Sequence, residues 1–319
     1  MSSAAMGDDA EERCASCGIT GGDDDDIKLK NCTACKLVKY CGVECQRNHR
    51  PQHKRACKKR AAELKDELLF KQPESTNFGD CPICFLPMRI TAQQDELKIF
   101  KKSCCSKVIC NGCEYANTLR EKAERLPMTC PFCRHPVMKN EAECHLHTMK
   151  RVEANDPFAC YQAGMRRFSA SDYATAIEYF DKAIELGDIE SHHLLSIVYK
   201  NGHGVQRDIK KVTYHLEKAA IGGHPIARHN LGWGEHDKGN IDRAVKHFII
   251  AAKLGIDESM QVLKTLYTKR VVSKEDFAAT LRAYQEAVDA MKSPQRDAAE
   301  SAENNIWDTD IIRDSDVCV

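Results

Sequence analysis

The sequence lacks an excess of charge of either sign. Its 319 residues include 47 lysines and arginines and 47 aspartates and glutamates, so the formal net charge is zero. Constitutive binders of nucleic acids or anionic membranes carry a surplus of positive charge. Seven basic residues lie between Arg47 and Arg60, but no aromatic residue is interleaved with them as in a base-stacking surface. We therefore expect neither a nucleic-acid nor a membrane partner, and a solvated helix face at these basic residues.

Long apolar runs are also missing. No stretch approaches the roughly 20 apolar residues that span a bilayer. The acidic residues 1–13 contain no apolar segment of the kind found in secretory or transit peptides. We therefore expect a cytoplasmic and/or nuclear protein, in a compartment where cysteines stay reduced.

Cysteine, in contrast, is abundant and unevenly distributed. Of the 18 cysteines, seven lie between Cys14 and Cys57 and eight lie between Cys81 and Cys133. In a reducing compartment such clusters indicate metal binding rather than disulfides. The chain thus contains two cysteine-rich segments followed by a cysteine-poor half.

The first segment offers eight ligands, which is the number that two tetrahedral Zn²⁺ sites require. These ligands are Cys14, Cys17, Cys32, Cys35, Cys41, Cys45, His53 and Cys57. The four-residue spacings of Cys41/Cys45 and His53/Cys57 place each pair one turn apart on a helix, with Pro51 in the first turn of the second helix. His49 is the alternative to His53, but only His53 has this relation to Cys57.

With Tyr40-Cys41, Cys45-Gln46 and His53-Lys54, the array resembles a MYND-type zinc finger. The resemblance implies a peptide-docking module without catalysis, whose ligand pairs interleave. One zinc ion would then be held by Cys14, Cys17, Cys41 and Cys45, and the other by Cys32, Cys35, His53 and Cys57. The loop between Gly18 and Asn31 is expected to be a disordered excursion.

The second segment offers eight further ligands: Cys81, Cys84, Cys104, Cys105, Cys110, Cys113, Cys130 and Cys133. It resembles an all-cysteine RING finger. The resemblance implies a cross-brace in which the first and third pairs hold one zinc ion and the second and fourth pairs hold another. Cys104 and Cys105 are adjacent, which departs from the family pattern; the alternative uses Cys105 and completes the site with His135. Both segments together predict four zinc ions.

The RING resemblance also implies a partner surface for an E2 ubiquitin-conjugating enzyme and ubiquitin. Ile83 and Pro131 stand where such ligases grip the E2, and Arg134 stands where an arginine bridges E2 and ubiquitin. The ligase would orient the E2–ubiquitin thioester and form no covalent intermediate. Alternatively, the three residues only pack their knuckles.

The remaining half shows helical periodicity in units of about 33–36 residues, the period of paired-helix solenoids. The units end near Gly187, Gly223 and Gly255, and Asp156-Pro157 forms a helix start. The pattern closely resembles Sel1-like repeats, which implies a scaffold that holds a protein partner. Its histidines lack cysteine or carboxylate pairs at ligand spacing and are expected to be structural or surface groups.

These patterns predict a mainly α protein, with a right-handed helical-repeat solenoid preceded by two small, cross-braced α+β zinc-finger modules. The expected divisions are a disordered N-terminus (1–13), the MYND-type finger (14–57), a linker helix (58–80), the RING-type finger (81–136), a connecting helix (137–155), the Sel1-like repeats (156–292) and a disordered tail (293–319).

The leading hypothesis is a RING-type E3 ubiquitin ligase whose MYND finger and repeats recruit protein substrates or peptides. The alternative hypothesis is a non-catalytic, zinc-dependent adaptor.

Overall fold

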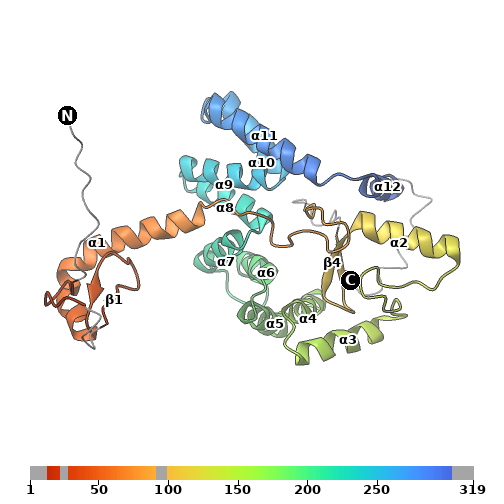
Figure 1. Ribbon diagram of the computed structural model, residues 1–319, viewed down its shortest axis with the longest axis horizontal. Helices are drawn as coiled ribbons and strands as arrows, with labels where there is room; N and C mark the ends of the chain where they lie inside the picture. Colours follow the sequence, from red (N-terminus) through yellow and green to blue (C-terminus); the bar gives the residue numbers. More distant parts are fainter. Residues whose placement is uncertain (1–12, 22–27, 91–98, 304–319) are drawn as a thin grey trace. The chain divides into compact units, whose positions relative to one another are not determined.

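The computed structural model describes residues 13–21, 28–90 and 99–303 (Figure 1). The chain divides into two compact units, Met1–Lys71 and Gln72–Val319. Each unit contains one cysteine-rich segment, called here the first module (residues 14–57) and the second module (residues 81–136). The disorder expected for residues 1–12, for the middle of the 18–31 loop and for residues 304–319 lies outside the described residues.

The first module combines a small antiparallel pair of strands with a long helix. Strands β1 (Lys30–Asn31) and β2 (Lys39–Tyr40) pair, and helix α1 (Val43–Leu69) follows. Two expectations are wrong here. Pro51 lies inside one continuous helix rather than at the start of a second one, and the linker helix expected over 58–80 is the second half of α1, which ends at Leu69.

The second module is a hairpin followed by a helix. Strands β3 (Ile99–Lys102) and β4 (Lys107–Cys110) pair antiparallel, and helix α2 (Asn111–Glu124) begins directly after β4. Met88 and Ile109 are fully buried among the cysteines, so the apolar core and the thiols occupy the same small volume. Helix α3 (Glu141–Glu153) then provides the connecting helix expected within 137–155.

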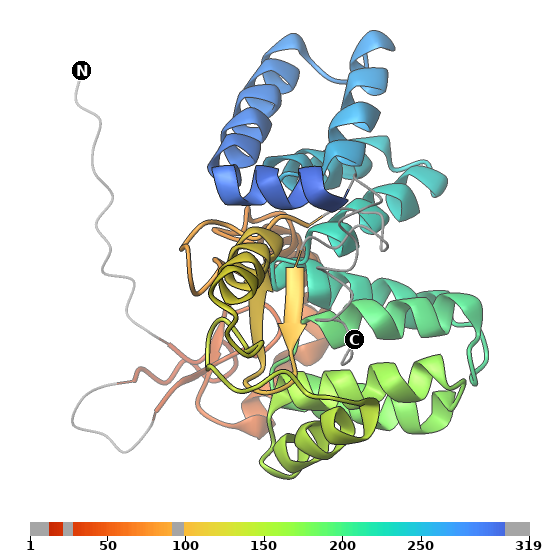
Figure 2. The ribbon, with the colours of Figure 1, turned by 90° about the vertical axis from the view of Figure 1, so that its right-hand side faces the viewer.

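Helix pairs form the rest of the second unit, in successive layers (Figure 2). The helices are α4 (Pro157–Ser169), α5 (Tyr173–Glu185), α6 (Glu190–Asn201), α7 (Ile209–Ile221), α8 (Pro225–Asp237), α9 (Ile241–Lys253), α10 (Asp257–Thr268) and α11 (Lys274–Ala290). Aspartate or serine side chains cap several N-termini, among them Asp156, Asp208 and Ser273. None of the helices among the described residues is both long and apolar enough to cross a membrane.

Small residues allow the paired helices to approach closely. Ala176, Ala219 and Ala244 are completely buried between helices. Gly164 of α4 faces the ring of Phe180, and Gly232 of α8 faces the ring of Phe248 in the equivalent place of a later repeat. A Cβ atom on either glycine would lie 2.6 Å from that ring. The expected solenoid is therefore present, and its mainly helical class is confirmed.

The tail differs from the expectation of disorder from residue 293 onward. Residues Pro294–Glu303 form helix α12, which packs against α2 of the second module. Ala299 and Ala302 are buried, with exposed fractions of 1% and 4%. The polar composition of this segment does not predict a helix that packs against a core. The helix is stabilised by its contact with α2.

Candidate metal centres

Four knuckles of the same geometry position four of the five Cys-x-x-Cys pairs, all but Cys110/Cys113. In each knuckle the residue four places after the first cysteine donates its backbone N–H to that cysteine's carbonyl, at 2.9 Å. The same residue adopts a left-handed conformation, with φ between 55° and 77°. These four residues are Gly18, Lys36, Phe85 and Arg134. Each tight turn directs two sulfurs toward one point.

The first tetrad joins Cys14, Cys17, Cys41 and Cys45. Cys14 pairs through its backbone with Lys39 of β2, and Cys45 lies in the first turn of α1. The Cys41 Sγ lies 3.6 Å from the Cys17 Sγ and 3.5 Å from the Cys45 Sγ. The strand pair and the helix start thus converge on one site.

The second tetrad joins Cys32, Cys35, His53 and Cys57. The His53 Nε2 lies 3.2 Å from the Cys35 Sγ, and the Cys32 and Cys57 sulfurs are 3.7 Å apart. The rival His49 instead places its Nδ1 3.1 Å from the Tyr40 hydroxyl. His49 is therefore a neighbour of the tetrad rather than a member.

The third tetrad joins Cys81 and Cys84 to Cys110 and Cys113. Cys110 ends β4 and caps α2, where its sulfur accepts the backbone N–H of Cys113 at 3.4 Å. Sulfur separations are 3.8 Å between Cys81 and Cys113 and 3.7 Å between Cys84 and Cys110. The hairpin and helix thus bring together pairs that are 26 or more residues apart.

The fourth tetrad joins the adjacent Cys104 and Cys105 to Cys130 and Cys133. Cys105 lies 3.9 Å from Cys130, and Cys104 lies 3.5 Å from Cys133, measured between sulfurs. The turn between β3 and β4 contains both cysteines and ends at Ser106, which has a positive φ of 54°. His135, the alternative ligand, places its Nδ1 2.8 Å from the Pro136 carbonyl oxygen.

The donor atoms fit zinc in kind and in spacing. The separations between neighbouring sulfurs, 3.5–3.9 Å, agree with the edge of about 3.8 Å expected for tetrahedral sulfur ligands at Zn–S distances of ~2.3 Å. Three tetrads are all-sulfur and one contains a histidine, which are ligand sets typical of structural zinc. The sixteen residues could therefore hold four Zn²⁺ ions.

The thiol pKa values of the first module show why a cation is needed. Burial opposes ionisation of Cys14 and Cys32, but backbone N–H groups that donate to their sulfurs lower each pKa to about 6. Hydrogen bonding to Cys45 raises the pKa of Cys41 to about 12, and burial and Cys32 raise that of Cys57 to about 11. Neighbouring thiolates repel one another, so a divalent cation must compensate them before all can ionise.

The three residues expected to contact E2 and ubiquitin lie on the two knuckles of the second module. Ile83 and Pro131 are partly buried, and Ile83 packs against the core of the module. Arg134 is exposed, and its Nη1 donates to the Asn117 Oδ1 at 3.1 Å. Their proposed contacts with partners stay a prediction.

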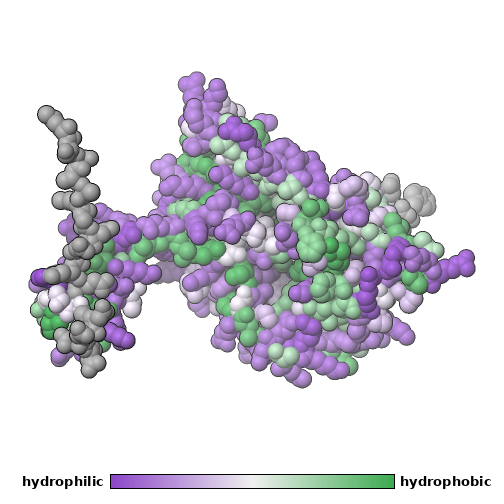
Figure 3. Space-filling view, in the orientation of Figure 1, coloured by the Kyte–Doolittle hydropathy of each residue, from purple (hydrophilic) through white to green (hydrophobic). Residues whose placement is uncertain are grey.

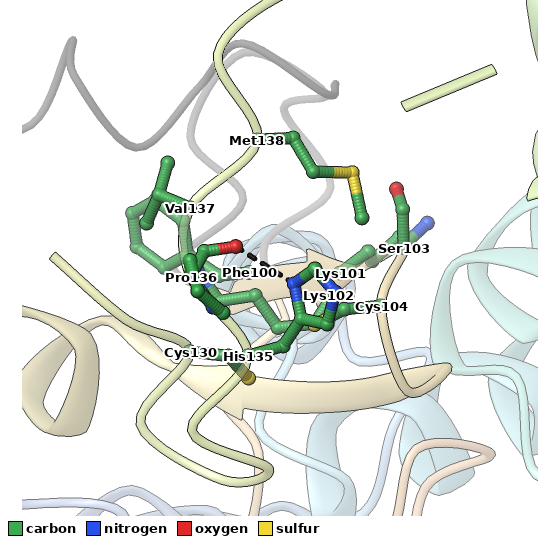
Figure 4. Close-up of a pocket in the computed structure, with 10 residues that line it drawn as sticks. All are labelled: Phe100, Lys101, Lys102, Ser103, Cys104, Cys130, His135, Pro136, Val137 and Met138. Carbon is green, nitrogen blue, oxygen red and sulfur yellow. Dashed lines mark hydrogen bonds between the residues drawn. The ribbon is translucent and has the colours of Figure 1, made fainter. Parts of the chain in front are cut away.

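A cavity of about 50 Å³ lies beside the fourth tetrad (Figure 4). Its lining includes Lys102, Cys104, His135 and Met138. A water molecule occupies about 30 Å³ of liquid, whereas small-molecule sites usually measure roughly 300–1,000 Å³. This cavity is therefore much smaller than the usual binding site of an organic substrate.

A fifth cluster of potential ligands lies in the solenoid: Glu190, His193 and His224. The His224 Nδ1 accepts the backbone N–H of Ala227 at 3.1 Å as the cap of α8, and its Nε2 lies 3.4 Å from a Glu190 carboxylate oxygen. Burial lowers the pKa of His193 to about 3 and keeps the ring neutral. One His224 nitrogen is thus engaged in the helix cap, and the Glu190 carboxylate accepts the Asn77 side-chain amide at 3.1 Å, so these groups are held by other contacts within the fold.

The sequence did not predict the charged residues that join the second module to the solenoid. Lys101 is half-buried, donates to the Tyr161 hydroxyl at 2.7 Å and lies over the rings of Phe78 and Tyr161. Arg151 of α3 donates to the Ser106 Oγ and, at 3.3 Å, to the Cys104 carbonyl oxygen. Nothing in their local sequence distinguishes these residues from surface lysines and arginines.

Comparison with known proteins identifies two parts of the chain. The MYND finger family matches residues 14–57, and the Sel1 repeat family matches residues 157–188, 189–224 and 225–256. The first module is therefore a MYND finger, and helices α4 to α9 form three Sel1 repeats, as expected. The RING-type assignment of the second module stays a prediction. No curated protein matches the sequence.

Two solved structures are similar to part of the chain. A Sel1 repeat protein from Oxalobacter formigenes is 19% identical with a TM-score of 0.40, over 57% of this chain and 73% of that protein. A protective antigen from uropathogenic Escherichia coli strains with an SLR fold is 17% identical with a TM-score of 0.42, over 61% of this chain and 54% of that protein.

Proposed function

We propose that the protein is a zinc-dependent adaptor that joins different protein partners. The observation that carries this proposal is the presence of a MYND finger and three Sel1 repeats, two kinds of protein-interaction module, in separate compact units. Zinc would act structurally, because every tetrad is filled by four protein ligands and leaves no open position for a substrate.

The second module offers a further docking surface. Phe85 and Phe132, one on each knuckle, are 76% and 41% exposed, and Leu119 of α2 is 41% exposed. Apolar side chains gather at the surface in the region of β4, among largely hydrophilic surroundings (Figure 3). Exposed apolar side chains of this size favour a protein partner.

A specific observation favours ligase activity as a second candidate. The four cysteine pairs of the second module interleave, first with third and second with fourth, as a RING cross-brace requires. If Ile83 and Pro131 grip an E2 enzyme, the exposed Arg134 on the second knuckle is within the same module to contact ubiquitin. The contribution to catalysis would be orientation of the thioester, which can supply several kcal/mol without a covalent step.

One experiment separates the two candidates: ubiquitin discharge from a panel of charged E2 enzymes, with zinc counted by native mass spectrometry in the same sample. The adaptor proposal predicts four zinc ions per chain and no accelerated discharge. Acceleration that is lost in Ile83→Ala and Arg134→Ala, with four zinc ions retained, would replace the adaptor by the ligase. Leu126→Ala, at an exposed position near the end of α2, is the matched control.

A further inference from the structure

Helix α12 is attached to the second module by its first turn. The Ser293 side chain caps the helix by accepting the Arg296 backbone N–H at 3.3 Å, and Pro294 begins it. The approach to α2 is very close, since a Cβ atom at Gly112 would lie 2.7 Å from the Arg296 backbone nitrogen. Gly112 immediately precedes the ligand Cys113, so α12 meets the second module beside the third tetrad.

The Arg296 side chain extends from this turn into the knuckle of Cys81 and Cys84. It is 4% exposed. Its Nη1 donates to the Pro87 carbonyl oxygen at 2.7 Å, and its Nη2 donates to the Leu86 carbonyl oxygen at 3.2 Å and to the Cys84 Sγ at 3.6 Å. The guanidinium therefore bonds both to a ligand sulfur and to the backbone that follows this ligand.

A second bond of Nη1 fixes the guanidinium to its own end of the chain. The Met291 carbonyl oxygen, at the end of α11, accepts it at 2.7 Å. The planar fork of arginine can bridge these acceptors at once, whereas the point charge of lysine cannot. Cys84 and Arg296 are 212 positions apart, so the contact exists only because the solenoid returns the chain to the second module.

The contact between Arg296 and Cys84 places a positive charge beside a site that is negative when zinc is bound. Zn²⁺ bound by four thiolates carries a net charge of −2, and the third tetrad is largely buried, with Cys81 fully inaccessible. A buried net charge is costly unless a counter-charge accompanies it. The fourth tetrad has a different arrangement, because Arg151 reaches the carbonyl oxygen of Cys104 rather than a sulfur.

We propose that Arg296 is the outer-shell cation of the Cys81, Cys84, Cys110 and Cys113 zinc site, and that α12 is needed for this site to retain its metal. Hydrogen bonds from outer-shell groups typically change metal affinity by about 10- to 100-fold. The inference concerns retention of zinc and is independent of whether the chain is an adaptor or a ligase. The competing explanation is that Arg296 only fastens α12.

The test is zinc release from the full-length, zinc-loaded protein under excess chelator. Native mass spectrometry counts the remaining ions, and alkylation of the freed cysteines identifies the emptied site. We expect Arg296→Gln to accelerate release from the third tetrad by about 10- to 100-fold, and from the other three by less than about twofold. Arg89→Gln is the matched control, because it removes the contact of Arg89 with Glu300 of α12 and no contact to sulfur.

Two results would overturn the proposal. One is an unchanged rate at the third tetrad together with faster hydrogen exchange in α12, as expected for a fastener alone. The other is equal acceleration at all four tetrads, as expected for general loss of stability. If Arg296→Gln does not fold, Arg296→Lys carries the test. This variant keeps the charge but not the planar fork. Its zinc release from the third tetrad should be faster than that of the wild type and of Arg89→Gln, by less than about 100-fold. A wild-type release rate together with faster hydrogen exchange in α12 would contradict the proposal.

Discussion

The MYND finger and the second module use equal numbers of ligands but differ in what surrounds them. The finger folds around its two tetrads within its own compact unit. The second module belongs to the same unit as the solenoid. It is joined to helices outside the module by contacts of Lys101, Arg151 and Arg296. Similar zinc chemistry thus supports an independent module in one case and part of a larger fold in the other.

This difference predicts how far unfolding should spread when zinc is lost from each module. A structural zinc site supplies most of the folding free energy of a small module. In a separate unit that loss stays local, whereas in a shared unit it removes hydrogen-bond partners from neighbouring helices. The solenoid itself has apolar cores around Phe180 and Phe248 and does not depend on metal for its own packing.

The largest expected effect comes from removing one ligand in each module. Cys35→Ser should unfold the MYND finger and leave the thermal midpoint of the solenoid unchanged within about a degree. Cys81→Ser should unfold the second module and lower the solenoid midpoint by roughly 5–10 °C, because Tyr161 and neighbouring groups lose their partners. Calorimetry with hydrogen-exchange mass spectrometry measures both. Equal shifts of the solenoid midpoint in the two variants would contradict the difference between the two modules.

A smaller effect is expected from the Lys101 ammonium, which links the second module to the solenoid. Burial opposes the charge of Lys101, but Tyr161 and Glu190 raise its pKa above the usual range. Lys101→Met removes this charge and leaves the Tyr161 hydroxyl without its Lys101 partner, which should cost about 2 kcal/mol of unfolding free energy.

Lys107→Met is the matched control for Lys101→Met. It lies in the same hairpin, is exposed and contacts the Phe132 ring. Its removal should cost less than about 1 kcal/mol. Urea unfolding of the second unit, followed by hydrogen exchange, would show the difference. Equal costs would mean that the contact of Lys101 with Tyr161 does not join the module to the solenoid.

The smallest effect tests the metal-independent packing of the solenoid. Gly232→Ala places a methyl group 2.6 Å from the Phe248 ring. This overpacking should lower the free energy of unfolding by about 1–3 kcal/mol, which exceeds the gain of about 1 kcal/mol from the higher helix propensity of alanine. Gly234→Ala, in the same helix, meets nothing within 4 Å and should be neutral or stabilising. We expect the two midpoints to differ by a few degrees, with or without chelator, and a stabilised Gly232→Ala would contradict this packing.

Much of the fold could be predicted from the sequence because its signals are local. A Cys-x-x-Cys pair needs only one turn to direct two sulfurs to the same point, so the ligands are visible as spacings. Helix pairs repeat at a fixed interval because each repeat contacts only its neighbours. The same local reasoning failed at Pro51, where one helix continues through the proline, and at α12, whose polar composition gives no sign of its binding surface.

The sequence by itself therefore determined the four cysteine and histidine tetrads, the MYND finger and the Sel1 repeats. Only the tertiary structure decided which charged side chains make contacts at the second module. Arg296 and Lys101 look like ordinary surface residues in the sequence, and their partners Cys84 and Tyr161 lie 212 and 60 positions away. Such contacts depend on where the whole path of the solenoid brings the chain, and no local pattern of residues encodes that path.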